Sequence, residues 1–146
     1  MLTGCYYNTI DSKGRALIPN KLRYRLGERI WLAKGIDDCL YILTQEAWSD
    51  FNDKYMKDLT LIDDSSRMLE RFVFGGSREI EIDGQGRINL PQDMIDYAKL
   101  IKDAVFVGCG GRVELWSAEL YEKVMSPDSV NPNELMRNAA RAAKEE

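Results

Sequence analysis

The apolar positions of this chain come in short runs separated by turn-forming residues, and the first runs predict a strand pair followed by a helix. Residues 4–10 are rich in aromatic and β-branched residues, so they predict a strand. Residues 15–18 predict a second strand, which we expect to pair with the first as a hairpin. Pro19 opens a predicted helix over residues 20–26, and Gly27 suits its C-terminal cap.

A second strand pair and a longer helix come next. Residues 30–33 and 40–43 are apolar and predict two further strands. Thr44 is the expected N-cap of a helix that reaches about residue 59. Apolar residues recur in it at spacings of three and four, so we expect this helix to be amphipathic. These residues are Trp48, Phe51, Tyr55 and Leu59.

The pattern then repeats, and a sequence motif marks the correspondence. Asp-x-x-Gly-Arg occurs at residues 11–15 and again at 83–87, and the offset of 72 also holds for the proline after each motif. An internal repeat explains this agreement better than chance does. Among the later strands, residues 105–108 align with the first copy at an offset of 75, and residues 113–116 at an offset of 73.

The repeat predicts two modules related by a pseudo-two-fold axis within the chain. We place the first module with its helix at 1–59, a helical linker at 60–76, the second module at 77–125 and a polar tail at 126–146. Modules of roughly 50 residues are marginal for independent folding, so they should share a core with each other or with neighbouring subunits. The Ala-, Arg- and Glu-rich tail is helical by propensity, and we expect it to be frayed or ordered by a partner.

Composition narrows the possible functions. The chain has no apolar run near the roughly 18 residues of a membrane span and no secretory pattern at its N-terminus, so we expect no membrane partner. Three widely spaced cysteines favour a reducing cytosol. Histidine, the commonest general base and metal ligand, is absent from the sequence. We therefore expect a cytoplasmic protein that is not an enzyme and that takes no cofactor, metal or small-molecule substrate.

Both motifs, the proline-headed helices and the run Gly-Arg-Val-Glu-Leu-Trp-Ser at 111–117 together resemble the MraZ family of bacterial transcriptional regulators, which are built from two SpoVT-AbrB-type domains. The resemblance covers about residues 1–125. It implies an α+β, mainly β fold: duplicated swapped-hairpin β-barrel modules with short helices. It also implies a nucleoid-associated, ring-shaped homo-oligomer that contacts promoter repeats upstream of a cell division and cell wall gene cluster.

The motif itself suits contact with DNA. An arginine at a hairpin tip can hold a phosphate or two acceptors of a guanine, and the adjacent glycine lets the backbone approach the duplex. The aspartate can orient the guanidinium through a bidentate pair. The alternative is that aspartate and arginine only staple the turn, and both roles can coexist. The candidate DNA-binding residues are Asp11, Lys13, Gly14, Arg15, Lys21, Arg23, Arg25, Asp83, Gly86 and Arg87.

Charge is unevenly spread between the two copies. The whole chain carries −4, yet residues 11–29 hold six basic and two acidic residues, a net charge of +4. The matching window 83–101 holds two basic and three acidic residues, a net charge of −1. Affinity for DNA follows the local field, so we expect the first module to carry more of the binding. The second module is then a scaffold or a weaker contact.

A protein partner is the competing hypothesis. The acidic total and the bare C-terminal helix favour a protein-interaction module or antitoxin-like adaptor that uses the same barrel. The leading expectation remains a homo-oligomer that binds double-stranded DNA.

Overall fold

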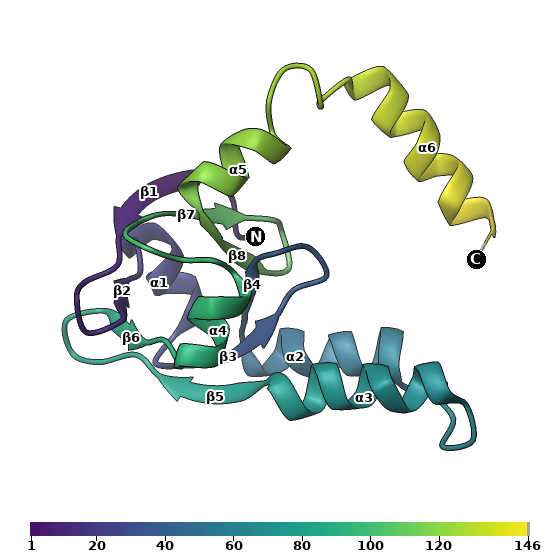
Figure 1. The fold of residues 1–146 in the computed structure, drawn as a ribbon, viewed down its shortest axis with the longest axis horizontal. Helices are drawn as coiled ribbons and strands as arrows, with labels where there is room; N and C mark the ends of the chain where they lie inside the picture. Colours follow the sequence, from purple (N-terminus) through teal and green to yellow (C-terminus); the bar gives the residue numbers. More distant parts are fainter. Residues whose placement is uncertain (146) are drawn as a thin grey trace.

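Six strands from the two halves of the chain form one antiparallel sheet in the computed structural model, which describes residues 1–145. The strand order is β1-β7-β8-β4-β3-β5 (Figure 1). Its strands are β1 Cys5–Thr9, β3 Arg29–Lys34, β4 Leu40–Leu43, β5 Arg78–Glu81, β7 Asp103–Gly108 and β8 Val113–Ser117. Two shorter strands, β2 Arg15–Leu17 and β6 Arg87–Asn89, form a separate antiparallel ribbon. We call this pair the motif ribbon.

The helices follow the two strand series. They are α1 Asn20–Leu26, α2 Gln45–Phe51, the π-helix η1 Asn52–Met56, α3 Asp64–Gly76, α4 Gln92–Tyr97, α5 Ala118–Val124 and α6 Pro132–Glu145. Thr44 caps α2 as predicted, because its side chain accepts a hydrogen bond from the Ala47 amide at 3.0 Å. The longer helix predicted after Thr44 runs from Gln45 to Met56, three residues short of residue 59, and changes from α- to π-helical geometry at Asn52. Within residues 1–145, no helix is both long and apolar enough to cross a membrane.

The first strand of each repeat pairs with the other repeat. The predicted hairpin of residues 4–10 with 15–18 is wrong: β1 pairs along its length with β7, and only an isolated bridge joins Ile10 to Ala16. In the same way, β5 pairs with β3. The turn closes locally, but the strands that leave it diverge into different sheets, which a local pattern of apolar residues does not reveal.

Residues that correspond in the two repeats face each other at two places. In the motif ribbon Ala16 lies opposite Ile88, at the sequence offset of 72. At the centre of the large sheet Tyr41 of β4 lies opposite Glu114 of β8, at an offset of 73. In each ladder, the two residue pairs that flank this central pair are related to each other by the same two-fold symmetry. A pseudo-two-fold axis therefore relates the two halves of the chain.

The α+β class is confirmed, but the closed barrel is not. Within residues 1–145 the large sheet is open, with β1 and β5 at its two edges. A closed barrel would need these edge strands to pair. Instead, the first strand of each repeat pairs with a strand of the other repeat.

One predicted alignment is off by a single residue. Trp31 pairs with Leu43, and Val105 pairs with Trp116, so β7 corresponds to β3 at an offset of 74, not 75. A shift of one residue sends each side chain to the opposite face of a sheet. Both strands carry buried residues on both faces, so apolar residues on their own could not fix the register.

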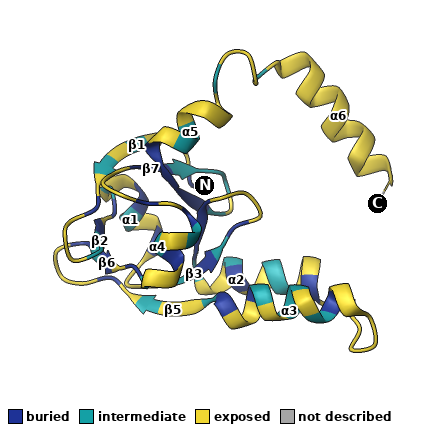
Figure 2. Cartoon of the chain, in the orientation of Figure 1, coloured by how far each residue is buried: buried dark blue, intermediate teal, exposed yellow. Residues whose placement is uncertain are grey.

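Two cores lie on the two faces of the large sheet. One face packs against the motif ribbon, α1 and α4, with Ala16, Leu22, Ile88 and Met94 almost fully buried. The other is covered by the helices of the α2–α3 hairpin, and its buried residues include Trp48, Met56, Val73 and Trp116. Figure 2 shows this buried interior and the exposed α6, in which none of residues 132–145 is buried.

Ile88→Ala tests the importance of the motif ribbon for stability. Ile88 is 1% exposed at the pseudo-two-fold axis, so its truncation leaves a cavity shared by both repeats. We expect the free energy of unfolding to fall by about 2–5 kcal/mol, measured by urea denaturation. Ile101→Ala, at a residue that is 86% exposed, is the matched control. Equal losses for the two variants would contradict this account.

Candidate nucleic-acid interface

The first motif forms a turn held by its own aspartate. The Oδ1 atom of Asp11 accepts the backbone amides of Lys13 and Arg15, each at 2.9 Å. Its Oδ2 atom accepts Nε of Arg15 at 2.7 Å. The Gly14 amide donates to the Asp11 carbonyl at 3.0 Å, which closes the turn. One carboxylate therefore fixes both the backbone of the turn and the direction of the arginine.

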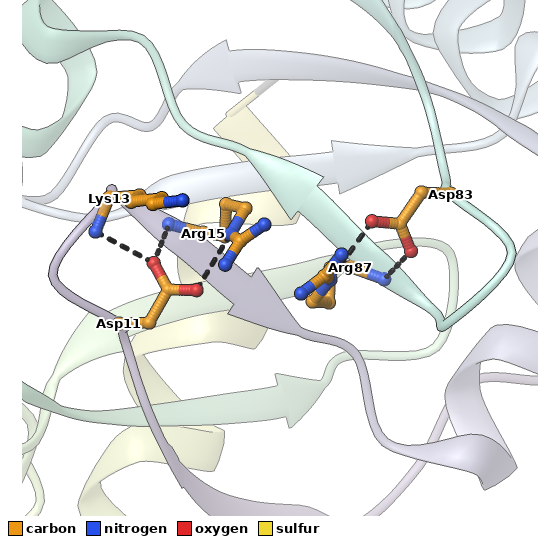
Figure 3. Close-up of polar contacts among 5 residues, drawn as sticks. All are labelled: Asp11, Lys13, Arg15, Asp83 and Arg87. Atoms are coloured by element: carbon orange, nitrogen blue, oxygen red, sulfur yellow. Dashed lines mark hydrogen bonds and ion pairs between the residues drawn. The ribbon is translucent and has the colours of Figure 1, made fainter.

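The second motif repeats this geometry. Oδ1 of Asp83 accepts the amides of Gln85 and Arg87 at 2.9 Å, and Oδ2 accepts Nε of Arg87 at 2.9 Å. Figure 3 shows the two aspartates on the outer sides of the motif ribbon, with the two arginines between them. The repeated sequence thus produces the repeated site.

The staple is present, but the predicted bidentate pair is not. Each aspartate uses one oxygen for backbone amides and the other for a single guanidinium nitrogen. Within residues 1–145, the Nη atoms of Arg15 and Arg87 donate no hydrogen bond. Each guanidinium is oriented through Nε while its outer nitrogens remain available for other acceptors.

The motif glycines bind the opposite repeat. Gly14 and Gly86 have φ of +76° and +84°, a conformation that favours glycine. The Gly14 carbonyl accepts the Leu90 amide and the Gly86 carbonyl accepts the Ile18 amide, both at 2.9 Å. The motif therefore joins the two halves of the chain as well as forming a turn.

The outer face of the motif ribbon carries four side chains. Arg15 lies opposite Asn89, and Leu17 lies opposite Arg87, while Ala16 and Ile88 point into the core. The candidate residues chosen from the sequence did not include Leu17 and Asn89. Strand alternation would have found Leu17 two residues after Arg15, and the offset of 72 would then have given Asn89.

The three basic residues predicted on α1 take two different positions. Arg23 lines an open depression of about 740 Å³ together with Asp83 and Gly84 of the second motif. A Cβ atom at Gly86 would collide with its guanidinium. Lys21 and Arg25 instead line a separate depression beside the N-terminal residues. The structure therefore brings Arg23 to the motif ribbon and directs the other two elsewhere.

The position of Arg23 changes the interpretation of the uneven charge between the two repeats. Arg23 belongs to the basic first repeat but lies beside the turn of the second. The corresponding residue in α4 is Ile95, whose Cδ1 atom would lie 3.2 Å from a Cβ at Gly14. The two motifs therefore share one surface, and the charge of each sequence window does not describe a separate surface.

Both motif aspartates are held in the charged form. Hydrogen bonds from the backbone of Arg15 lower the pKa of Asp11 below its ordinary value, helped by the Arg15 side chain and the Lys13 amide. The pKa of Asp83 is lowered in the same way by Arg87 and Gln85. The hydrogen bonds of each turn therefore favour the charged carboxylate over the neutral one.

The fold and the paired turns define a class: a two-repeat α+β protein whose repeats exchange strands. Both halves, residues 1–72 and 73–145, match the family model described as "MraZ protein, putative antitoxin-like". The chain is 42% identical over 135 residues to the transcriptional regulator MraZ of Caldanaerobacter subterraneus subsp. tengcongensis, covering 92% of this chain and 94% of the relative. The protein of that name from Clostridium tetani is 44% identical over 123 residues, covering 84% and 86%. The chain belongs to the MraZ family of transcriptional regulators.

Asp11→Asn tests the charged staple through its pH dependence. A carboxyl whose pKa is lowered by folding adds stability that is complete well above its unfolded pKa of about 4 and is lost as the pH falls through the folded pKa. We expect the variant to unfold at lower urea than the wild type at pH 7, and the difference to shrink below about pH 4. Asp128→Asn, at an exposed acid outside both motifs, is the control. A difference that does not change with pH would contradict the charged staple.

Proposed function

We propose that the protein regulates transcription by binding double-stranded DNA with the outer face of the motif ribbon. The observation that carries this proposal is that Arg15 and Arg87 lie on the same outer face of the motif ribbon, and that within residues 1–145 their Nη atoms donate no hydrogen bond. A major groove about 12 Å wide admits a two-stranded β-ribbon. The pseudo-two-fold axis through this ribbon also suits a duplex, whose backbone has its own two-fold symmetry.

Preorganisation explains why each arginine is paired with an aspartate. A free arginine side chain loses rotamer freedom on binding, and the Nε–Oδ2 contact fixes much of that freedom in advance. The outer nitrogens then present donors to the O6 and N7 atoms of guanine or to phosphate oxygens. Asn89 can pair with adenine, and Leu17 can contact a thymine methyl group.

Basic residues around the ribbon would supply the phosphate contacts. Lys13 belongs to the first turn, and Arg23 lies beside the second. Lys21 and Arg25, which line a different depression, would reach only a phosphate path that extends past α1. Such contacts make affinity fall steeply as salt rises, because bound counterions are released.

One motif ribbon offers few contacts, so we infer that several copies act together. A ring-shaped homo-oligomer on repeated promoter elements would gain affinity through effective concentration. Its implied targets are promoter repeats of a cell division and cell wall gene cluster, reached in the cytoplasm at the nucleoid. The exchange of first strands supports the swapped-hairpin arrangement of the predicted modules, 1–59 and 77–125.

A protein-binding adaptor is the second candidate. The fully exposed α6 and the acidic α2–α3 hairpin favour it, as does the antitoxin-like description of the family. An adaptor would bind its partner through these helices and would not need the arginines of the motif ribbon.

Arg15→Ala and Arg87→Ala separate these functions. We expect each to weaken binding to a fluorescent duplex with promoter-like direct repeats by about tenfold or more, since a base or phosphate contact of this kind contributes about 1–3 kcal/mol. The slope of log affinity against log salt should also become shallower. Binding is measured by fluorescence anisotropy at several salt concentrations.

Arg71→Ala is the matched control, because Arg71 is exposed on α3, which covers the face of the large sheet opposite the motif ribbon. It should bind nearly as the wild type does. Weak binding by the wild type that responds neither to salt nor to the arginine variants would instead favour the adaptor.

A further inference from the structure

The outer face of the motif ribbon is two-fold symmetric in its arginines but not in the two side chains beside them. The pseudo-two-fold axis exchanges Arg15 with Arg87 and Leu17 with Asn89, both at the sequence offset of 72. The first pair is identical, whereas the second sets an isobutyl group against a carboxamide. We call these four outward-facing positions the corners of the ribbon. Two corners therefore carry the same chemistry and two carry opposite chemistry.

The two unlike corners are accessible, and the backbone holds them in place. Leu17 is 43% exposed, and Asn89 is exposed at the end of β6. The Leu17 carbonyl accepts a hydrogen bond from the side-chain amide of Asn8 at 3.0 Å. The Leu90 amide, next to Asn89, donates to the Gly14 carbonyl at 2.9 Å. None of these bonds uses the side chain of Leu17 or Asn89, so a substitution there leaves the ribbon in place.

The spacing of the corners suits neighbouring base pairs. Side chains directly opposite each other in an antiparallel pair lie about 4.5–5.5 Å apart, and residues two apart in one strand lie about 6.5 Å apart. Base pairs stack at about 3.4 Å, so the face spans about two base-pair steps. When the axis of the ribbon coincides with a dyad of the duplex, Leu17 and Asn89 face base pairs that this dyad relates.

Contacts to phosphate cannot choose between the two directions in which the ribbon lies on the duplex. The duplex backbone has the same two-fold symmetry, so turning the chain by 180° about the ribbon axis leaves these contacts unchanged, and they carry no sequence information. The unequal turns, with Lys13 in the first and Gln85 at the matching position of the second, are therefore neutral in this respect. Of the four corners, only Leu17 and Asn89 present different groups to the bases.

The two groups favour different bases. A carboxamide can accept from N6 and donate to N7 of adenine, whereas an isobutyl group suits the methyl group of thymine. An adenine that faces Leu17 would lose water from N6 and N7 without gaining a partner, and this costs free energy. Adenine beside Asn89 and thymine beside Leu17 at the dyad-related position is therefore the favoured combination.

We propose that Leu17 and Asn89 determine the direction in which each chain lies on the duplex, and that its preferred element is therefore non-palindromic. The inference rests on the proposed DNA-binding function and assigns these two residues as its specificity determinants. The arginines supply recognition that is equal in both directions, and the unlike corners decide between them.

The test begins with the element that the wild-type chain selects from duplexes with one randomised window of about ten base pairs, one turn of DNA. We expect adenine at one of two dyad-related positions and thymine at the other. Three single-element duplexes are then compared by fluorescence anisotropy: the selected form and the two palindromes made by repeating either of its halves. The wild type should bind the selected form about tenfold more tightly than either palindrome, the usual effect of one mismatched base pair.

Exchanging the two side chains distinguishes direction from simple affinity. Leu17→Asn makes both unlike corners carboxamides, so it should prefer the palindrome with adenine at both positions. Asn89→Leu should prefer the palindrome with thymine at both. The double variant Leu17→Asn, Asn89→Leu presents the wild-type face turned by 180°, so it should again prefer the selected form. Leu61→Asn, at a residue that is 80% exposed between α2 and α3, is the matched control and should rank the duplexes as the wild type does.

Three results would overturn the inference: a palindromic selected element, an identical ranking of the three duplexes by both single variants, or a double variant that does not return to the selected form. Arg15→Ala is measured on the same duplexes to judge the function separately. If its binding is weakened while any of these three results is found, DNA binding stands and the direction-setting role falls. Wild-type binding that is weak on all duplexes and insensitive to salt would contradict the proposed function, and the inference with it.

Discussion

The structure depends on the short ladder between β2 and β6. Three residues of each strand pair across the pseudo-two-fold axis, and Ala16 and Ile88 close the core beneath them. At each end of the ladder the carbonyl of a motif glycine holds the chain of the opposite repeat just before its helix. Neither repeat completes this arrangement by itself, which explains physically why the motif occurs twice.

The same residues that join the repeats also shape the proposed binding surface. Each aspartate holds its turn through two backbone amides, and its second oxygen directs the arginine outward. Stability and the proposed recognition of DNA therefore depend on the same positions. A substitution of aspartate disturbs the turn and the arginine together, whereas a substitution of arginine leaves the backbone bonds of the turn in place. The arginine variants are for this reason the cleaner probes of function.

The sequence predicted local structure well, but it did not predict which strands pair with each other. Helix α1 and its glycine cap, the Thr44 cap and the aspartate staple all follow from residues close together in the chain, and the structure contains each of them. The exchange of β1 and β5 between repeats did not follow, because strand pairing is decided by contacts far apart in sequence. Because β3 and β7 carry buried residues on both faces, their apolar pattern also hid the true offset of 74. The position of Arg23 beside Gly86 depends on the pairing of β2 with β6 and on the hydrogen bond from the Ile18 amide to the Gly86 carbonyl, so the motif alone could not predict it.

The central claim is that the two motifs act as one surface on DNA. Amide hydrogen exchange of the protein, with and without a promoter-repeat duplex, tests it most directly. The account predicts that DNA slows exchange at both turns, residues 11–17 and 83–89, in the same complex, with no comparable change in the α2–α3 hairpin. Protection of the first turn alone, or protection centred on the hairpin, would contradict it.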